Sequence, residues 1–304
     1  MTMTKLIALV TALLTMLLAA CQPAPAEKPL QYSMEPAKLE VPVYRFAVHP
    51  LHNPQLLAEA YWPLVEHLNR QLSGARIELE ASRDYQAFEQ KLRAREPAII
   101  LPNPWQTLQA IKVGYHVIAM AGDAADFRGI FIVRKDSGIK TPADLKGRVV
   151  SYPSPTALAA CIMPQYFLHQ HGINVNRDIQ NVYVGSQESS IMNAYLGTSA
   201  AGATWPPPWR LFQRDHPAEA AQLQVAWETP ALLNNSVMVH DDVPANVVQT
   251  IRTTLLDLTA TAQGQAILAG MATARFHTAD DASYDAVRDY VAVFEKTVRP
   301  VESK

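Results

Sequence analysis

From residue 43 onward, short apolar runs alternate with longer amphipathic runs, and only a few residues separate each run from the next. Strands that alternate with helices through short connections favour an α/β sheet, in which ligand-binding loops follow the carboxyl ends of the strands. The expected strands of the first part are 43–48, 76–81, 98–101 and 116–121, and the expected helices are 55–72, 84–94 and one that begins near 104. The loops 49–53 and 102–105 follow strand ends and are the places to look for ligand contacts.

The alternation restarts after an apolar run at 129–135, which predicts a second α/β lobe. The expected strands there are 149–152, 182–184, 201–204 and 224–228, and the expected helices are 141–146, 154–169 and 187–196. A return strand at 236–240 is followed by the expected helices 245–261, 263–271 and 283–295, which pack most simply on the first lobe. Three prolines follow Trp205, and because proline disrupts helices and central strands, we interpret 205–209 as a rigid aromatic loop. A chain of 304 residues exceeds the usual size of one core, which agrees with two lobes.

The N-terminal segment indicates export. A short positive start is followed by an apolar run of thirteen residues and then by Leu18-Ala19-Ala20-Cys21. Because the apolar run is too short to span a bilayer comfortably, we interpret 1–20 as a signal peptide. The motif before Cys21 resembles a bacterial lipobox, which implies a lipid on the Cys21 sulfur and a protein anchored to a membrane facing the periplasm. An uncleaved membrane anchor is the alternative.

Residues 21–42 carry five prolines among small and polar residues, which predicts an extended tether between the lipid and the folded domain. Cys161 is the only other cysteine in the sequence. If Cys21 carries lipid, Cys161 has no intramolecular partner, so the fold depends on a conventional hydrophobic core.

Two stretches, 152–157 and 185–190, each follow an expected strand and open an expected helix. They bring the hydroxyls of Ser154, Thr156 and Ser186 to helix starts. The first N–H groups of a helix lack internal partners, and the helix dipole adds partial positive charge there. Two such starts that face one cleft would bind a phosphate-like oxyanion without arginine. Serine and threonine are also ordinary N-caps, so a purely structural role stays open.

Composition and motifs argue against other classes of function. The formal net charge is -2, and the sequence has no basic run interleaved with aromatics, so we expect no nucleic-acid partner. It also lacks a nucleophile elbow, a His-Glu-x-x-His motif, a dinucleotide-binding glycine motif and a P-loop, so we expect neither catalysis nor a cofactor. His169 and His171 precede a glycine at an expected helix end, where they suit the helix dipole better than a metal site.

Several segments resemble known periplasmic binding proteins. The loop after the first strand, Pro102-Asn103-Pro104-Trp105 and the Thr141-Pro142-Ala143-Asp144-Leu145-Lys146-Gly147 segment resemble type II periplasmic binding proteins. The stretch 152–164 followed by Gly172-Ile173, and Gly185-Ser186-Gln187-Glu188 followed by Ala203, resemble the solute-binding proteins for phosphate, phosphite and phosphonate, called PhnD-like. The similarity covers roughly residues 43–294.

The resemblance implies a two-lobe α/β fold with two crossing strands, at 129–135 and 236–240, as the hinge. Lobe 1 would comprise 43–130 plus 238–304, and lobe 2 would comprise 131–237. Ligand would be clamped between the lobes by closure about the hinge.

The resemblance also implies positions for ligand contacts. The family's anion-wrapping loop corresponds to Ser154, Thr156 and Ala157, although its usual Ser-Gly pair is missing here. The family's Gly-Ser-His element corresponds to 185–187, where Gln187 replaces the histidine and still donates an N–H. With the strand-end residues added, the expected ligand-binding set is Ser154, Thr156, Ala157, Ser186, Gln187, Trp105, His49, Thr204 and Trp205.

For ligand and partner, the resemblance implies a monomeric lipoprotein that hands a small phosphorus oxyanion or phosphonate to an ABC permease. Glu188 is the only acid in the two binding loops, which favours a small anion over an aminoalkyl phosphonate. The alternative is a sensor subunit that binds arsenite or a related oxyanion for a histidine kinase. Helical spacing places Cys161 on the face of Ala157, where it is either a soft-anion thiol or a buried hydrophobe. An enzyme on the same fold is the third possibility.

Overall fold

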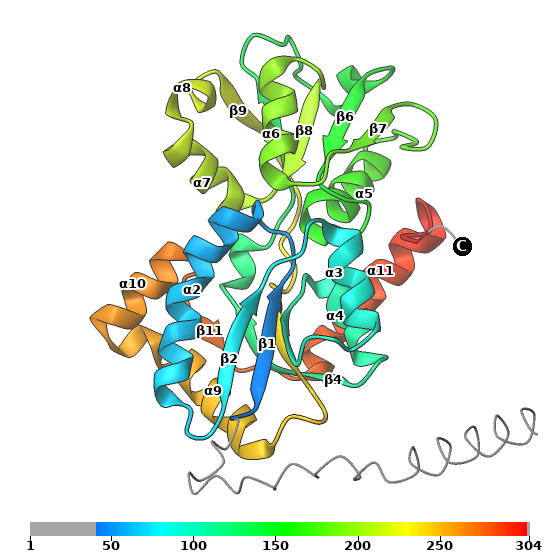
Figure 1. Cartoon of the computed structure of the whole chain (residues 1–304). Coiled ribbons are helices and arrows are strands. Elements are labelled where there is room, and N and C mark those ends of the chain that lie inside the picture. The colour runs from blue at the N-terminus through cyan, green and yellow to red at the C-terminus, as the bar shows by residue number, and fades with distance from the viewer. Residues whose placement is uncertain (1–40, 303–304) are drawn as a thin grey trace, which may run out of the picture. The chain divides into compact units, whose positions relative to one another are not determined.

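The computed structural model describes residues 41–302, which form two α/β lobes, each built on one sheet (Figure 1). The expected signal peptide, Cys21 and all but the last two residues of the expected tether lie outside the described residues. None of the helices in 41–302 combines the length and apolar character needed to cross a bilayer.

The first lobe contains a six-stranded sheet in the order β11-β4-β10-β3-β1-β2. Its strands are β1 (Val43–Val48), β2 (Arg76–Glu80), β3 (Ile99–Leu101), β4 (Tyr115–Ala121), β10 (Ser236–His240) and β11 (Phe276–His277). Strand β1 pairs in parallel with β2 and β3, whereas β10 runs antiparallel to β3 and β4. The carboxyl ends of β1 and β3 therefore lie side by side, and so do the loops that follow them.

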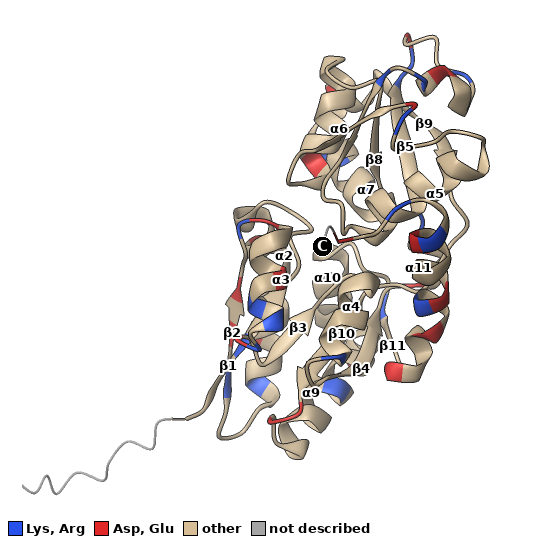
Figure 2. Ribbon diagram, turned by 90° about the vertical axis from the view of Figure 1, so that its right-hand side faces the viewer, with Lys and Arg blue, Asp and Glu red and all other residues tan. Residues whose placement is uncertain are grey.

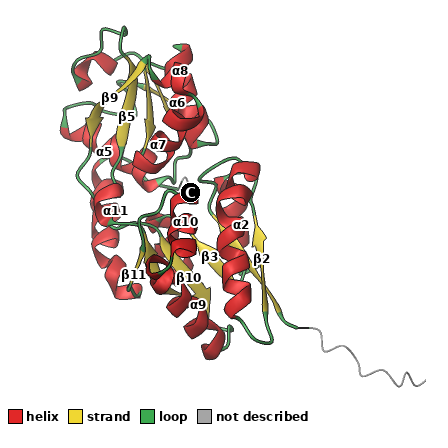
Figure 3. Cartoon of the chain, turned by 90° about the vertical axis from the view of Figure 1, so that its left-hand side faces the viewer, coloured by secondary structure: helices red, strands yellow, loops and turns green. Residues whose placement is uncertain are grey.

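Helices cover both faces of this sheet. One core cluster joins the sheet to α2 (Pro54–Gln71), α9 (Ala245–Asp257) and α10 (Ala262–Gly270), which lie together in Figure 3. A second cluster joins the other face to α3 (Tyr85–Arg93), α4 (Pro104–Ile111) and α11 (Asp285–Thr297). The 3₁₀ turns of this lobe and its connections are η2 (Ala124–Asp126), η5 (Leu258–Ala260) and η6 (Asp281–Tyr284).

The second lobe contains a five-stranded sheet in the order β7-β6-β8-β5-β9. Its strands are β5 (Ile130–Arg134), β6 (Val149–Tyr152), β7 (Gln180–Tyr183), β8 (Ala201–Thr204) and β9 (Leu223–Glu228). Its helices are η3 (Pro142–Leu145), the π-helical turn η4 (Leu158–Ile162) continued by α5 (Met163–Gln170), α6 (Gln187–Leu196), α7 (Pro206–Asp215) and α8 (Pro217–Ala220). Strand β6 is parallel to β7 and β8, so the loops after these three strands meet at one edge.

The chain passes between the two sheets through residues 122–129 and 229–235. Strand β5 belongs wholly to the second sheet and β10 wholly to the first, so the passages lie just before the two segments expected to cross. The segment after α11 joins the lobes by hydrogen bonds: Asn176 Nδ2 donates to the Val298 carbonyl at 2.8 Å, and Arg299 Nε donates to Gln165 Oε1 at 2.7 Å. The C-terminal segment 298–302, assigned to lobe 1 from sequence, thus also contacts lobe 2.

The interpretation of 205–209 as a loop was wrong, because α7 begins at Pro206. The three prolines occupy the first three helical positions, where the N–H groups have no partner within the helix and their absence costs nothing. The helix expected at 154–169 likewise begins later, at Leu158, after a turn in which Ala157 N donates to the Ser154 carbonyl. As a result, Trp205 becomes the N-cap of α7, and Ser154 and Thr156 lie in a turn before the helix.

Charged residues of both signs are interspersed over the described chain (Figure 2). Along α11, for example, Asp285 pairs with Arg288, and Arg134 of β5 pairs with Asp136 at 2.7 Å. These exposed pairs contribute little to stability individually, so the fold depends mainly on the apolar clusters.

Candidate functional site: a cavity between the two lobes

The loops at the strand ends of both sheets meet around one small cavity, which we call the inner cavity. Its volume is about 10 Å³, close to the minimum that holds a single water. The lining residues come from both lobes and include neither lysine, arginine nor a carboxylate: His49, Tyr85, Asn103, Phe127, Ala157, Leu158, Ala159, Ala160, Gln187, Trp205 and Asn235.

A helix start forms one wall of the inner cavity. Ala157 is the N-cap, and Cys161 N and Ile162 N both donate to its carbonyl. The first three helical residues, 158–160, line the cavity, and their N–H groups precede the first internal hydrogen bond of the helix. Together with the helix dipole they suit an anion. The helix start packs against Gly129, and only glycine fits at 129, because a Cβ on this residue would lie 2.5 Å from the Ala159 carbonyl oxygen.

Gln187 forms the opposite wall at the start of α6. This helix packs closely on β8, since a Cβ on Gly202 would lie 2.1 Å from the Ser190 carbonyl oxygen. Gln187 is buried, and its Oε1 accepts a hydrogen bond from Thr204 Oγ1 at 2.9 Å. Its Nε2 donates to Tyr85 Oη of the first lobe at 3.2 Å. Gln187 is therefore held in place by both lobes while it faces the cavity.

His49 enters the cavity from the loop after β1. Its Nδ1 lies 2.9 Å from the Leu101 carbonyl oxygen, so Nδ1 carries the proton and donates it there. Burial lowers the pKa of His49 to about 4, against the opposing effect of this hydrogen bond. The ring is therefore neutral near pH 7, and Nε2 is left as its hydrogen-bond acceptor. No group in the described part of the chain donates to that nitrogen.

The structure brings four of the sequence-predicted site residues to the inner cavity: His49, Ala157, Gln187 and Trp205. The other five do not line it. Thr204 supports Gln187, and the Ser186 hydroxyl caps α6 by accepting from Ser189 N at 3.1 Å.

The Ser154, Thr156 and Trp105 side chains are also directed elsewhere. Trp105 packs in the apolar cluster beneath α4. Ser154 Oγ lies 2.9 Å from Thr156 Oγ1, which donates to Glu89 Oε1 of α3 at 2.6 Å. These hydroxyls therefore link the two lobes beside the inner cavity. Residues 157–160, which follow them, line the cavity.

Sequence reasoning missed seven lining residues: Tyr85, Asn103, Phe127, Leu158, Ala159, Ala160 and Asn235. Asn103 had a usable signal, because it lies in a loop that follows a strand end; its Nδ2 donates to the Thr156 carbonyl at 3.2 Å. Asn235 lies at the end of the second passage between the sheets, and its buried Oδ1 has no partner among the described residues. Only the packing of the two lobes brings these side chains together.

Glu89, which the sequence also did not single out, is buried at the junction of the lobes. Burial raises the pKa of its carboxyl, and the hydrogen bonds from Thr156 and Gln106 oppose that rise. A carboxyl with a raised pKa binds its proton more tightly in the folded state. It therefore costs no stability at acid pH and destabilises the fold as the pH rises through the folded-state pKa.

Replacing Glu89 by glutamine is therefore expected to raise the thermal unfolding midpoint at pH 8 by about 2–4 °C. Glutamine keeps an acceptor for Thr156 and removes the charge, so the difference should disappear below about pH 4. Scanning fluorimetry of both proteins across this range measures it. The matched change Glu66→Gln, at an exposed position of α2, should shift the midpoint by less than about 1 °C. A midpoint at pH 8 equal to or below that of the unmodified protein would contradict the expectation.

Cys161 lies in the apolar core of lobe 2 and not at the inner cavity. The π-helical turn changes the spacing on which the expected shared face with Ala157 rested. Burial raises the pKa of the Cys161 thiol to about 12, although Arg299 Nη2, 3.5 Å from its sulfur, opposes this. A neutral, buried thiol does not favour the arsenite-sensor alternative.

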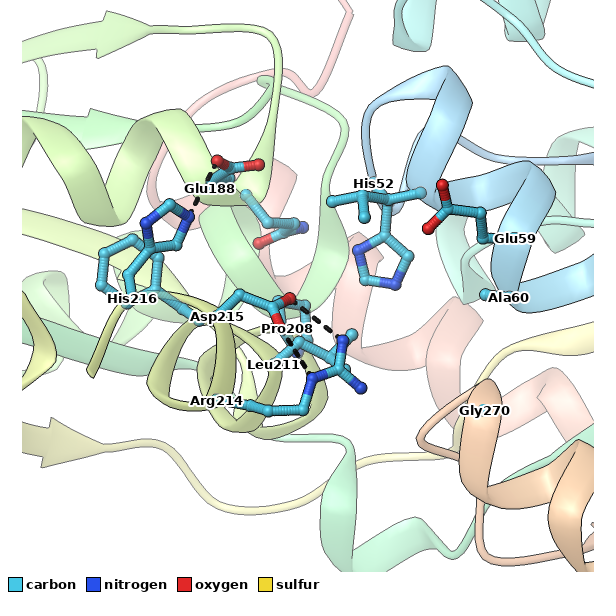
Figure 4. Close-up of a pocket in the computed structure, with 13 residues that line it drawn as sticks. His52, Glu59, Ala60, Glu188, Pro208, Leu211, Arg214, Asp215, His216 and Gly270 are labelled. Carbon is cyan, nitrogen blue, oxygen red and sulfur yellow. Dashed lines mark hydrogen bonds and ion pairs between the residues drawn. The ribbon is translucent and has the colours of Figure 1, made fainter.

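A larger pocket of about 440 Å³, which we call the outer pocket, adjoins the inner cavity through Gln187, which lines both. Figure 4 shows His52 and Glu59 on one side and the paired side chains of Arg214 with Asp215 and of His216 with Glu188 on the other. Arg214 Nε lies 2.7 Å from Asp215 Oδ1, and His216 Nε2 lies 3.3 Å from Glu188 Oε1. Burial lowers the pKa of His52 to about 4, so this ring is neutral near pH 7. Three carboxylates against one guanidinium leave the outer pocket negative.

Comparison with known proteins identifies the family. The family model for the periplasmic substrate-binding protein of phosphonate ABC transporters matches residues 46–284, most of the chain. The chain belongs to this phosphonate-binding family. The family expected from the sequence is thereby confirmed, and the inner cavity of this phosphonate-binding family member lies within the matched residues.

One relative of this family member is the probable ABC transporter phosphite binding protein PhnD1 of Prochlorococcus marinus, 25% identical over 135 residues. The match covers 42% of this chain and 46% of that protein, so the chain spans about half the length of this curated relative. A binding-protein component of an ABC phosphonate transporter from Pseudomonas aeruginosa superposes with a TM-score of 0.78, at 17% identity over 85% of this chain and 88% of that one.

PhnD1 from Prochlorococcus marinus in complex with methylphosphonate superposes with a TM-score of 0.76, at 19% identity over 84% of this chain and 98% of that one. At these identities the structural matches establish the fold. The two-lobe type II periplasmic-binding-protein fold expected from the sequence is confirmed.

Proposed function

We propose that this protein captures a small phosphonate or phosphite in the inner cavity and delivers it to an ABC permease from the periplasmic side of a membrane. In this proposal it acts by binding, without catalysis or cofactor, and a lipid on Cys21 anchors it. The observation that carries the proposal is the helix start at 158–160, which lines the inner cavity together with Gln187 and has N–H groups without partners inside the helix. Membership of the phosphonate-binding family and the methylphosphonate complex of a structural relative support the ligand class.

The contacts between lobes support a closing mechanism. Thr156 bonds Glu89, Asn103 bonds the Thr156 carbonyl and Gln187 bonds Tyr85, and each pair joins one lobe to the other. The inner cavity is about 10 Å³, and a tetrahedral oxyanion needs more room than one water. Ligand entry therefore requires these contacts to open through the passages 122–129 and 229–235, and ligand would then be held by groups from both lobes.

Thermal stability tests the proposed ligand class. A ligand that binds only the folded state raises the unfolding midpoint as its concentration increases, by about 2.7 kcal/mol of stabilisation at a hundred times its Kd. We expect a rise with methylphosphonate or phosphite and a smaller one or none with sulfate. No rise with either methylphosphonate or phosphite would refute the proposal, and phosphate, arsenate and arsenite are tested beside them. A rise with arsenite alone, lost in Cys161→Ser, would restore the sensor alternative.

A further inference from the structure

The inner cavity combines hydrogen-bond donors on one wall with an acceptor, the unprotonated Nε2 of His49. Leu158, Ala159 and Ala160 contribute N–H groups, whereas His49 contributes the lone pair of Nε2. The tautomer of His49 is fixed, because the Leu101 carbonyl accepts from Nδ1 and offers no proton in return. A fully ionised oxyanion has only acceptors and would place an oxygen lone pair against that of Nε2.

The charges around the inner cavity also count against a doubly charged ligand. The titratable groups around it are Tyr85, Glu89 and Arg93 of α3, His52 of the His49 loop, Glu188 of α6, Arg214 with Asp215 of α7, and Arg299 of the C-terminal segment. Arg93 lies 3.8 Å from Glu89, and Arg299 donates to the Pro155 carbonyl. Burial raises the pKa of Tyr85, so it stays neutral, and Arg214 is paired with Asp215. No free cation in the described part of the chain faces the cavity, so a second negative charge would be buried without a partner.

Asn235 does not decide between the two forms of the ligand. Its amide is neutral and can turn either its oxygen or its NH₂ group toward the cavity. The Gln187 side chain is also a neutral amide, and its two polar atoms already bond Thr204 and Tyr85. The acceptor Nε2 of His49 is therefore the group that distinguishes the singly ionised ligand from the doubly ionised one.

We propose that the inner cavity selects the singly ionised form of its phosphonate ligand, whose remaining O–H group donates to Nε2 of His49. The N–H groups of 158–160 bind the charged oxygens of the same phosphonate group. This inference rests on the proposed function, and it adds which protonation state binds and which residue recognises it. The second proton of such acids dissociates near neutral pH, as it does in phosphate monoesters, with a pKa of about 6. The selection therefore operates in the range where the protein would work.

Calorimetric titration of the protein with methylphosphonate from pH 5.5 to 9 tests the inference. The Kd should be constant below the second pKa of the ligand and should rise about tenfold per pH unit above it, because only the singly ionised fraction binds. Methanesulfonate has the same shape and one charge but no O–H at any of these pH values. It should bind at least about tenfold more weakly than methylphosphonate at pH 6, with no dependence on pH.

Two variants assign the effect to His49. His49→Gln replaces the fixed acceptor by an amide that can donate, so the preference for methylphosphonate over methanesulfonate should fall toward one and the pH slope should flatten. His169→Gln, at an exposed position of α5, should keep both. A Kd for methylphosphonate that is constant or falls through its second ionisation would overturn the inference, and so would methanesulfonate binding as tightly at pH 6. Absence of binding by every phosphonate and phosphite at every pH would instead overturn the proposed function, and the inference with it.

Discussion

Replacing Gln187 by glutamate is expected to weaken methylphosphonate binding by about 100-fold at pH 8. The substitution keeps the shape of the side chain: one carboxylate oxygen accepts from Thr204 as Oε1 does now, and the other accepts from the Tyr85 hydroxyl where Nε2 now donates to it. It adds a negative charge beside the helix start at 158–160. Two like charges about 5 Å apart repel by about 3 kcal/mol at the effective dielectric constant of a protein, which corresponds to the loss of binding.

The pH dependence and a matched variant make this expectation specific. Because burial raises the pKa of a carboxyl, the ratio of variant to unmodified Kd should shrink as the pH falls toward 5. Gln180→Glu adds the same charge on the exposed edge strand β7 and should change the Kd by less than about twofold. Calorimetric titration measures both proteins. A Gln187→Glu protein that binds within about threefold of the unmodified protein at pH 8 would remove Gln187 from the site.

The arrangement of strands and the two helix starts were predictable from sequence because their signals are local. Apolar runs and connection lengths define the strands, and a hydroxyl before an amphipathic run marks a helix start. Gln187 follows the capping residue Ser186, so its place at the start of α6 could be read from three adjacent residues. The parallel pairing of β6 with β7 and β8 then brings both starts to the same edge.

The direction of individual side chains was not predictable, because it depends on partners distant in sequence. Thr156 was expected to face the ligand, yet its hydroxyl bonds Glu89, 67 residues earlier in the chain. Arg93 follows Glu89 by one helical turn and lies 3.8 Å from its Oε2, so the local sequence favours an ordinary ion pair on α3 and gives no signal that Glu89 is buried. The prolines after Trp205 were misread for a different reason: their missing N–H groups matter inside a helix, but not in its first turn. The position of backbone N–H groups at a helix start was therefore easier to predict than the direction of a side chain.

Arg299 ties the C-terminal segment to the loop that precedes the anion-binding helix start. Its Nε donates to Gln165 Oε1 at 2.7 Å and its Nη2 donates to the Pro155 carbonyl at 3.0 Å, both in lobe 2. The guanidinium also lies 5.3 Å from the centre of the Phe294 ring at the end of α11. Gln165 is fully buried, so removal of Arg299 leaves its amide oxygen without a partner.

The change Arg299→Met is therefore expected to lower the free energy of unfolding by about 3 kcal/mol, since it removes the charge-assisted hydrogen bonds to Gln165 and Pro155 and keeps much of the apolar stem. Methylphosphonate binding should weaken by about tenfold, because the turn before 158–160 loses its support at Pro155. Arg299→Lys retains the charge but not the planar fork, so it should recover less than half of the lost stability.

Urea unfolding measures these changes as shifts in the midpoint at an unchanged slope. The control Arg275→Met, at an exposed position between α10 and β11, should alter stability by no more than about 0.5 kcal/mol. If Arg299→Met unfolds at the same urea concentration as Arg275→Met, the C-terminal segment does not hold lobe 2. If stability falls but the Kd does not rise, the segment supports the fold of lobe 2 without positioning the helix start, which Gly129 and Asn103 then hold without it.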